Sequence, residues 1–320
     1  MIKTGDILDN TYKILEEIGT GGSGIIYKAY HIRLKKYLVI KLLKNEVRNK
    51  LNERSEVDIL KNLKHTYLPQ VYDFLIEDDN VYTVMDFIPG KSLYDELKKR
   101  NKFSTKKVIK WGIQLCEALS YLHTRNVPII HSDIKPENIM LMPDDNICLI
   151  DFNISLLFNN ELKTICYSDG YSPPEQKSIY NIVDRMYINT YDEENIQSSM
   201  LSELNCGKTY RANKTVKFKI DTRADIYSLG ATLYHLITGE KPNSDILLMN
   251  KKIKLDHRLG KIIFKAMNED VNKRYQSAEE MLSELICLNR YDNVLKEGKW
   301  IIKAYYRSIL TLKSLKDRIK

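Results

Sequence analysis

The sequence has 320 residues, of which 43% are hydrophobic and 29% are charged, and its formal net charge is +8. These values are typical of a folded, water-soluble protein with one large domain or two small ones. No apolar run reaches the roughly 18 residues that a membrane-spanning helix needs, and we expect neither such a helix nor a signal peptide. The five cysteines are widely spaced and form no C-x-x-C pair, so neither a disulfide framework nor a zinc site is indicated, and we expect a cytoplasmic protein.

The positive charge is concentrated at the end of the sequence. Residues 288–320 carry nine Lys or Arg and three acidic side chains, so six of the eight net positive charges lie there. Because the remainder is nearly neutral, we do not expect a nucleic-acid partner. Apolar residues in this tail recur at roughly helical spacing, which favours an extra helix packed on the rest of the protein. A basic amphipathic helix that touches an anionic membrane surface, or one that docks a partner, is the alternative.

The first part of the chain has the pattern of a small β-sheet with one helix. Short apolar segments bounded by turn residues predict the strands. They lie at residues 12–19, 25–31, 37–43, 71–77 and 81–88. A charged segment at residues 46–63 has apolar residues on one face and predicts the helix.

After about residue 86 the spacing of apolar residues becomes helical. We expect helices at residues 92–99, 108–123, 225–239 and 277–288. Gly239 ends the third of these helices, and Ser277 with Glu280 forms a capping box at the start of the fourth. The polar stretch at about residues 177–219 is longer than a usual connection, which predicts a partly ordered surface insertion or a flexible loop.

A Gly-rich segment, GTGGSG, follows the first predicted strand and contains Gly19, Gly21 and Gly24 in a G-x-G-x-x-G pattern. The pattern alone is weak evidence, because glycines also occur in plain turns. A dinucleotide-binding loop lies between a strand and a helix, whereas here a second strand follows. The segment therefore predicts a strand-turn-strand flap whose backbone amides approach phosphate groups.

Lys41 ends the apolar segment LVIK, seventeen residues after Gly24. A lysine beside a buried strand needs an anionic partner or ligand. Glu56 in the predicted helix is the preferred partner, because Leu60 and Leu63 then face the core one and two turns later. Glu53 is the alternative.

The segments HSDIKPEN and DFN contain polar residues suited to phosphoryl transfer. This reaction needs a carboxylate near the incoming hydroxyl, a cation near the transferred phosphate and oxygen ligands for magnesium. Asp133, Lys135 and Asn138 fit these three roles in that order. Asp151 follows a buried segment and is expected to be the main magnesium carboxylate, since Mg²⁺ prefers hard oxygen ligands.

Together these motifs resemble those of the eukaryotic-like serine/threonine protein kinases, particularly their bacterial branch. The resemblance runs from about Tyr12 to Leu288 and rests on a series of features in the family's order. The series comprises the Gly-rich segment, Lys41, Glu56, MDF at 85–87, the catalytic loop, Asp151, SPPE at 172–175, DIYSLG at 225–230 and Arg274. Lys135 followed by Pro-Glu-Asn looks like the Ser/Thr type rather than the tyrosine type.

The resemblance implies an α+β fold with two lobes. The β-rich N-lobe covers residues 1–86, the larger and mainly helical C-lobe covers residues 87–288, and a basic helical tail follows at 289–320. The resemblance also implies binding of ATP and Mg²⁺, with Lys41, Glu56, Asp133 and Lys135 as the catalytic residues. The γ-phosphate then passes to a Ser or Thr hydroxyl of a protein substrate, with autophosphorylation as one option.

The same resemblance assigns the adenine site. Ile26, Val39, Met85 and Met140 enclose the adenine ring, and the backbone from Asp86 to Ile88 binds its edge. Val39 stands where the family usually has Ala, which makes the pocket slightly tighter.

The resemblance also assigns roles to four further residues. Glu175 and Arg274 form a buried ion pair, and Asp225 holds the backbone of the catalytic loop from a central helix. Ser168 lies beside the substrate's hydroxyl-bearing residue, as the corresponding Thr does in the family.

Two residues depart from the family's pattern. Ser132 stands where the family has Arg, so a phosphate on the activation segment lacks its usual anchor, and phosphorylation of Thr164 or Ser168 is not expected to be the activating switch. Asn153 stands where the family has Gly, and Asn tolerates a left-handed backbone better than most residues. We therefore expect altered regulation and an active enzyme, because the lysine, glutamate and metal positions are all present.

Two alternatives to an active protein kinase remain. One is a nucleotide-binding pseudokinase that acts as a signalling or interaction module. The other is a small-molecule phosphotransferase of similar fold, although such enzymes lack the SPPE and DIYSLG segments.

Overall fold

The computed structural model describes residues 2–21, 24–43, 60–77, 80–151, 167–180, 220–243 and 256–290. The predicted partners Glu53 and Glu56, together with Asn153 and Thr164, lie outside the described residues. The same holds for residues 181–219 of the predicted insertion and for residues 291–320 of the tail.

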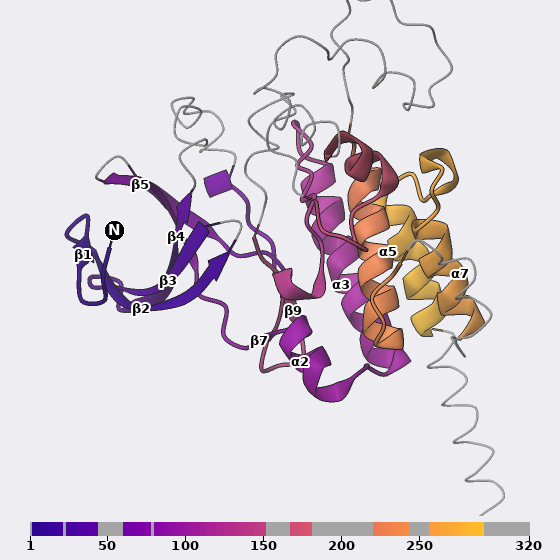
Figure 1. Ribbon diagram of the computed structural model, residues 1–320, viewed down its shortest axis with the longest axis horizontal. Coiled ribbons are helices and arrows are strands. Elements are labelled where there is room, and N and C mark those ends of the chain that lie inside the picture. Colours follow the sequence, from indigo (N-terminus) through magenta and orange to yellow (C-terminus); the bar gives the residue numbers. More distant parts are fainter. Residues whose placement is uncertain are drawn as a thin grey trace, which may run out of the picture.

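A six-stranded antiparallel sheet forms the N-terminal part of the protein (Figure 1). Its strands are β1 (Ile7–Leu8), β2 (Tyr12–Gly21), β3 (Gly24–His31), β4 (Lys36–Leu43), β5 (Val71–Glu77) and β6 (Asn80–Asp86). They pair in the order β1-β2-β3-β4-β6-β5. The five predicted strands are confirmed, and only the two-residue β1 was not predicted.

One face of this sheet is apolar because the strands alternate apolar and polar residues. Ile14 of β2, Ala29 of β3, Ile40 of β4 and Val84 of β6 are at most 1% exposed and belong to one cluster. The predicted helix before β5 is described only at its end, where Leu60 is helical and buried.

A small three-stranded sheet lies between the N-terminal sheet and the large helices in Figure 1. Its strands are β7 (Lys91–Ser92), β8 (Ile139–Leu141) and β9 (Ile147–Leu149). Helix α2 (Leu93–Arg100) follows β7, and Ser92 caps it by accepting a hydrogen bond from the Asp95 backbone N–H at 3.0 Å. The short helix η2 (Pro136–Asn138) leads into β8.

The C-terminal part is built around α3 (Thr105–His123), α5 (Arg223–Thr238) and α7 (His257–Ala266), with η5 (Val271–Lys273) after them. Two more helical stretches cover residues 174–180 and 278–290. Every residue from 224 to 236 in α5 is buried, so this helix is the centre of the core. Figure 1 shows α5 between α3 and α7.

The predicted helix ends are largely confirmed. Gly239 ends α5 in a left-handed conformation (φ 81°) that glycine adopts without steric cost. Ser277 accepts from the Glu280 backbone N–H at 3.2 Å, whereas the Glu280 carboxylate accepts from the backbone of Gln276. Helix α7 was not predicted, although Asp256 caps it in the usual way.

The predicted fold class is confirmed: the protein is α+β, with a β-rich N-terminal lobe and a mainly helical C-terminal lobe. The residue boundaries that we assigned to the lobes, the insertion and the tail stay predictions. Among the helices that the structure describes, none is long and apolar enough to cross a membrane.

Candidate active site

A cavity of about 850 Å³ lies between the N-terminal sheet and the segment that carries β7, β8 and β9. Four apolar residues predicted to enclose adenine, Ile26, Val39, Met85 and Met140, all line it. Asp86 and Ile88, in the chain that connects the two lobes, line it as well. The cavity therefore brings together the apolar side chains and the connecting backbone that were predicted from separate parts of the sequence.

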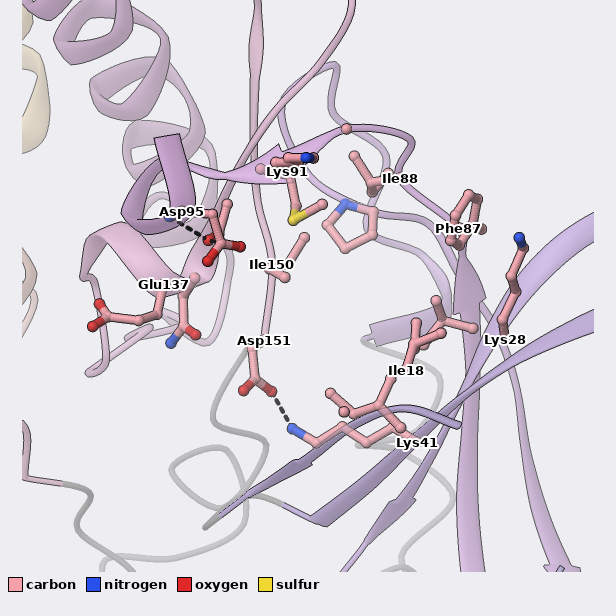
Figure 2. Close-up of a pocket in the computed structure, with 18 of the residues that line it drawn as sticks. Ile18, Lys28, Lys41, Phe87, Ile88, Lys91, Asp95, Glu137, Ile150 and Asp151 are labelled. Carbon is pink, nitrogen blue, oxygen red and sulfur yellow. Dashed lines mark hydrogen bonds and ion pairs between the residues drawn. The ribbon is translucent and has the colours of Figure 1, made fainter. Parts of the chain in front are cut away.

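Lys41 and Asp151 meet across this cavity. Lys41 is 7% exposed, and its Nζ donates to Asp151 Oδ1 in an ion pair that joins β4 to the residues after β9. Figure 2 shows Lys41 reaching from the sheet toward Asp151. The pairing of Lys41 with Glu56 stays a prediction, because Glu56 lies outside the described residues.

The three glycines of the Gly-rich segment have different surroundings. Gly19 lines the cavity. Gly24 has φ +127°, and a side chain there would collide with the backbone carbonyl of Leu42 on β4. Gly24 is thus required by the conformation and packing of the sheet itself. Gly21 is the last residue of β2 and pairs with Gly24.

Asp133 is the centre of a hydrogen-bonded cluster on the C-terminal side of the site. Its Oδ2 accepts from Lys135 Nζ at 2.7 Å and from Asn138 Nδ2 at 3.0 Å, and its Oδ1 accepts from the Ser168 hydroxyl at 2.6 Å. Lys135 Nζ also donates to Ser168 Oγ at 2.9 Å. The predicted catalytic pair is therefore in direct contact, and a hydroxyl group already lies against the carboxylate.

The environment of Asp133 lowers the pKa of its carboxyl group below the ordinary value. Burial raises this pKa, but the charge and hydrogen bond of Lys135, the hydroxyl of Ser168 and the charge of His131 together lower it further than burial raises it. Asp133 is consequently a carboxylate at neutral pH, which is the form that accepts a proton.

The side chain of Asp225 holds the backbone of the catalytic loop from α5, as predicted. Asp225 Oδ2 accepts from His131 N at 2.8 Å, and its Oδ1 accepts from Ser132 N at 2.7 Å. Asp225 is fully buried, so these charge-assisted bonds are shielded from water. His123 Nε2 lies 2.9 Å from the same carboxylate.

The two halves of the site are joined through Ile150. Its backbone N–H donates to Asn138 O at 2.9 Å, and its carbonyl accepts from His131 Nε2 at 3.1 Å. These bonds fix Asp151, the next residue, relative to the loop that carries Asp133. Asp151 has φ 65°, so a left-handed backbone lies at Asp151 itself.

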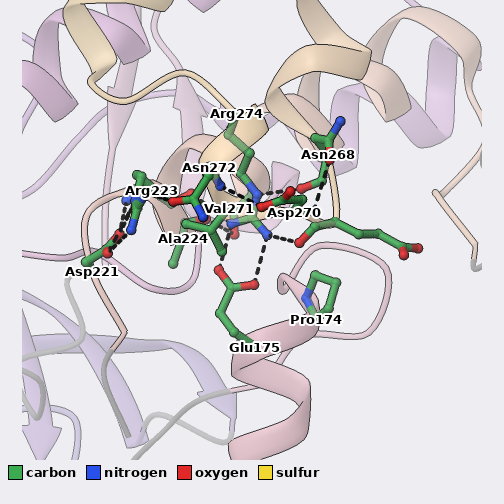
Figure 3. Close-up of polar contacts among 12 residues, drawn as sticks. Pro174, Glu175, Asp221, Arg223, Ala224, Asn268, Asp270, Val271, Asn272 and Arg274 are labelled. Carbon is green, nitrogen blue, oxygen red and sulfur yellow. Dashed lines mark hydrogen bonds and ion pairs between the residues drawn. The ribbon is translucent and has the colours of Figure 1, made fainter. Parts of the chain in front are cut away.

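The predicted ion pair between Glu175 and Arg274 is present and bidentate (Figure 3). Arg274 Nη1 and Nη2 donate to the two oxygens of Glu175 at 2.6 and 2.8 Å. The Arg274 side chain is fully buried, whereas that of Glu175 is 25% exposed. The pair anchors the helical stretch at residues 174–180 to the C-terminal core.

Sequence reasoning missed several polar groups in the cavity. Asp95 and Glu137 line it on the side opposite the sheet, as Figure 2 shows. A signal that was not used could have placed Asp95, because the Ser92-x-x-Asp95 spacing is typical of a helix start, and Asp95 lies in the first turn of α2. We find no comparable signal for Glu137, because it lies between residues that were assigned for other reasons.

The donor set of the site suits magnesium. Asn138 and Asp151 both line the cavity and supply oxygen atoms, and Asn138 is oriented by its Nδ2, which donates to Asp133. Mg²⁺ characteristically takes one or two protein oxygens together with phosphates and water. Among the described residues there is no group of three or more His, Cys, Asp or Glu that could hold a metal alone.

Comparisons with known proteins agree with this geometry. The protein kinase domain family matches residues 12–185, more than half of the sequence. The chain therefore belongs to the protein kinase family, which confirms the resemblance seen in its motifs.

The similar curated proteins include two probable serine/threonine-protein kinases of bacteria. That of Clostridium perfringens is 27% identical over 92% of this chain, and that of Clostridium acetobutylicum is 29% identical over 90%. The chain spans only 41% and 42% of the lengths of these two relatives.

Solved structures show the same fold. The kinase domain of Mycobacterium tuberculosis PknI has a TM-score of 0.61 and 18% identity, covering 89% of this chain and 98% of that domain. Rad53 residues 1–466 in complex with AMP-PNP have a TM-score of 0.61 and 20% identity, and the match covers 86% of this chain and 64% of that chain.

Proposed function

We propose that the protein is an ATP- and Mg²⁺-dependent kinase that transfers the γ-phosphate to a serine or threonine hydroxyl of a protein. The observation that carries this proposal is the hydrogen bond from the Ser168 hydroxyl to Asp133 Oδ1, because it supports the fit of an alcohol against an ionised carboxylate. The bacterial relatives named as probable serine/threonine-protein kinases support the choice of acceptor.

The adenine of the bound nucleotide would lie in the apolar part of the cavity. Adenine would contact Val39 and Met140, and its edge would bind the backbone near Asp86. Lys41 lines the cavity beside Asp151, so its ammonium group lies in the space where the phosphates would bind. Rad53 binds AMP-PNP in its solved structure, which supports ATP as the nucleotide here.

Proton transfer would centre on Asp133. Its carboxylate accepts the proton of the acceptor hydroxyl while the hydroxyl oxygen bonds to the γ-phosphorus and the bond to the ADP oxygen breaks. Lys135 lies 2.7 Å from this carboxylate and would neutralise charge on the transferred phosphoryl group. Catalysis of this kind depends mainly on position and charge rather than on a covalent intermediate.

Magnesium would be held by Asn138 and Asp151. When bound, the ion neutralises phosphate charge and fixes the direction of the phosphoryl group. The Asn138 side chain is oriented for this because its amide nitrogen donates to Asp133 Oδ2 and to the Asp133 carbonyl, at 3.0 and 2.8 Å. The amide oxygen is then the atom that is suited to a cation.

The experiment is transfer of labelled γ-phosphate from ATP with Mg²⁺, both to the protein itself and to a generic basic protein. Wild-type protein should produce labelled phosphoserine or phosphothreonine. In Asp151→Ala the rate of phosphate transfer should fall about a hundredfold or more, because a charged group is removed from the site. Asp9→Asn removes a carboxylate from the exposed turn between β1 and β2, so it serves as the control and should behave as the wild type does.

The competing pseudokinase function predicts a different result. ATP would then raise the melting temperature of the wild type, as any ligand of the folded state does, without any label reaching a hydroxyl. Label in a small-molecule acceptor but not in protein would instead favour the small-molecule phosphotransferase.

A further inference from the structure

Gln176 is a fully buried side chain whose amide lies against the catalytic loop. It belongs to the helical stretch at residues 174–180, in which Glu175 is anchored by Arg274. Gln176 is 0% exposed, and its Nε2 donates to the backbone carbonyl of Ser132 at 2.9 Å. The motif analysis assigned no role to this residue.

Ser132 is the loop residue with the least favourable backbone. It has φ 61°, in the left-handed region that non-glycine residues adopt only when their surroundings enforce it, and it is 1% exposed. Its N–H donates to Asp225 and its carbonyl accepts from Gln176. The peptide groups on both sides of this strained residue are therefore each held by a buried side chain.

The carbonyl that Gln176 holds belongs to the peptide group that continues into Asp133. Rotation of this peptide group would carry the Asp133 carboxylate away from Lys135 and Ser168. The segment at residues 167–180, which contains Gln176, also contains Ser168, whose hydroxyl donates to Asp133 Oδ1 at 2.6 Å. One segment thus contacts both the carboxylate and the backbone that directs it.

We propose that Gln176 is a positioning residue for phosphoryl transfer, which holds the left-handed backbone of Ser132 so that Asp133 faces the acceptor hydroxyl. The proposal rests on the proposed kinase function for its effect on rate. The contact itself also has a structural consequence, which can be measured without any activity.

Gln176→Leu removes the donor at nearly constant volume. We expect kcat to fall about tenfold, the factor that corresponds to one hydrogen bond of ordinary strength, with the KM for ATP unchanged. Gln114→Leu is the matched control, because Gln114 is also buried and its side-chain amide bonds Asn146 and Ile147 at the start of β9, away from the loop that carries Asp133. This control should lose stability without a specific loss of kcat.

Ser132→Gly provides a rescue, because glycine adopts a left-handed backbone without the cost that serine incurs. In Ser132→Gly/Gln176→Leu the loop no longer needs the restraint, so we expect kcat to recover to within about threefold of the wild type. A merely structural role for Gln176 would leave the loss unchanged by this second substitution.

Hydrogen exchange supplies a readout that does not depend on catalysis. The amides of residues 128–138 should exchange about tenfold faster in Gln176→Leu than in Gln114→Leu at matched conditions. If the wild type transfers no phosphate, the proposed function fails, and the exchange rates still decide whether Gln176 holds the loop. An unchanged kcat in an active protein, or unchanged exchange, would overturn the proposal.

Gln176→Leu itself could prove insoluble. In that case Ser132→Gly/Gln176→Leu must be soluble and must keep the wild-type protection of residues 128–138, because the strain at residue 132 is gone. If both variants are insoluble, the proposal is overturned, because the buried amide of Gln176 is then needed for folding whichever residue stands at position 132.

Discussion

The two sides of the site are held in different ways. On the side where we propose that the acceptor hydroxyl binds, here called the acceptor side, Asp133 is bonded within its own loop to Lys135 and Asn138, and to Ser168 of the next segment. On the side where we propose that ATP binds, here called the nucleotide side, the ion pair between Lys41 and Asp151 joins the sheet to the rest of the site. The acceptor side is thus fixed before a substrate arrives, whereas the nucleotide side depends on a contact between two lobes.

The difference follows from where the residues lie. The acceptor side packs on α5, whose residues 224–236 are all buried, and a rigid core holds polar groups in fixed positions. Lys41 lies on β4, in a sheet with its own separate apolar cluster. Substitutions on the acceptor side should therefore change the chemical step, and substitutions on the nucleotide side should change binding as well.

The largest effect is expected from Asp133→Asn, which removes the proposed proton acceptor but keeps the shape of the side chain. We expect kcat to fall about a thousandfold, within the range for a positioned general base. ATP should bind as tightly as it does to the wild type, because Asp133 does not line the nucleotide cavity. Steady-state kinetics and ATP binding by calorimetry measure the two quantities.

Asp9→Asn is again the control, since it makes the same chemical change at an exposed position. A fall in kcat below tenfold for Asp133→Asn would show that another group accepts the proton, and the assignment of the acceptor side would be wrong.

Lys41→Met tests the nucleotide side. We expect kcat/KM for ATP to fall about a hundredfold, because a charged donor to the phosphates is removed and Asp151 loses its partner. Unlike Asp133→Asn, this variant should also bind ATP more weakly. Lys13→Met makes the same substitution at an exposed position of β2 in the same sheet. This control variant should keep wild-type kinetics.

Equal loss of kcat without weaker ATP binding in Lys41→Met would remove the distinction between the two sides. The ion pair would then be part of the same rigid unit as Asp133.

Much of this arrangement could be predicted from the sequence. The strands and helices follow from periods of two and of 3.6 residues. Lys41 and Asp151 stood out because each lies at the end of an apolar segment, and Asp133 and Asn138 stood out because the segment HSDIKPEN supplies the groups that phosphoryl transfer needs. The contacts between distant segments could not be predicted this way. Nothing in the local pattern of Gln176 indicates a bond to Ser132, 44 residues earlier in the chain.

The left-handed backbone in the loop that carries Asp133 could not be predicted from the sequence either. Ser132 has a left-handed backbone, although serine is not one of the residue types that are enriched in this conformation. Tertiary contacts impose it at Ser132, through Asp225 and Gln176. Surface pairing was likewise not predictable. Lys36 and Tyr72 both donate to the carboxylate of Asp86, but many other charged side chains of this sequence could have paired instead.

The smallest effect is expected from Ser168→Ala, which leaves the proton acceptor in place and removes one bond to it. The rate should fall about tenfold for the loss of one hydrogen bond in the active arrangement. The informative quantity is the pH dependence of kcat in Ser168→Ala. Burial has the largest effect on the pKa of Asp133 and raises it. Lys135 has the next largest effect and lowers this pKa, and the hydrogen bond from the Ser168 hydroxyl lowers it further.

Asp133 acts as a carboxylate, so activity is present above its folded-state pKa and is lost as the pH falls through that pKa. Without Ser168 the pKa moves up, and the acid limb of the kcat profile should therefore shift to higher pH. Ser168→Thr restores the hydroxyl and should restore the wild-type limb, and Ser178→Ala, on the exposed side of the next helical stretch, should leave it unmoved. A shift to lower pH, or an equal shift in Ser178→Ala, would mean that the limb reports a group other than Asp133. An upward shift confined to Ser168→Ala would instead link the acid limb to the carboxylate on the acceptor side.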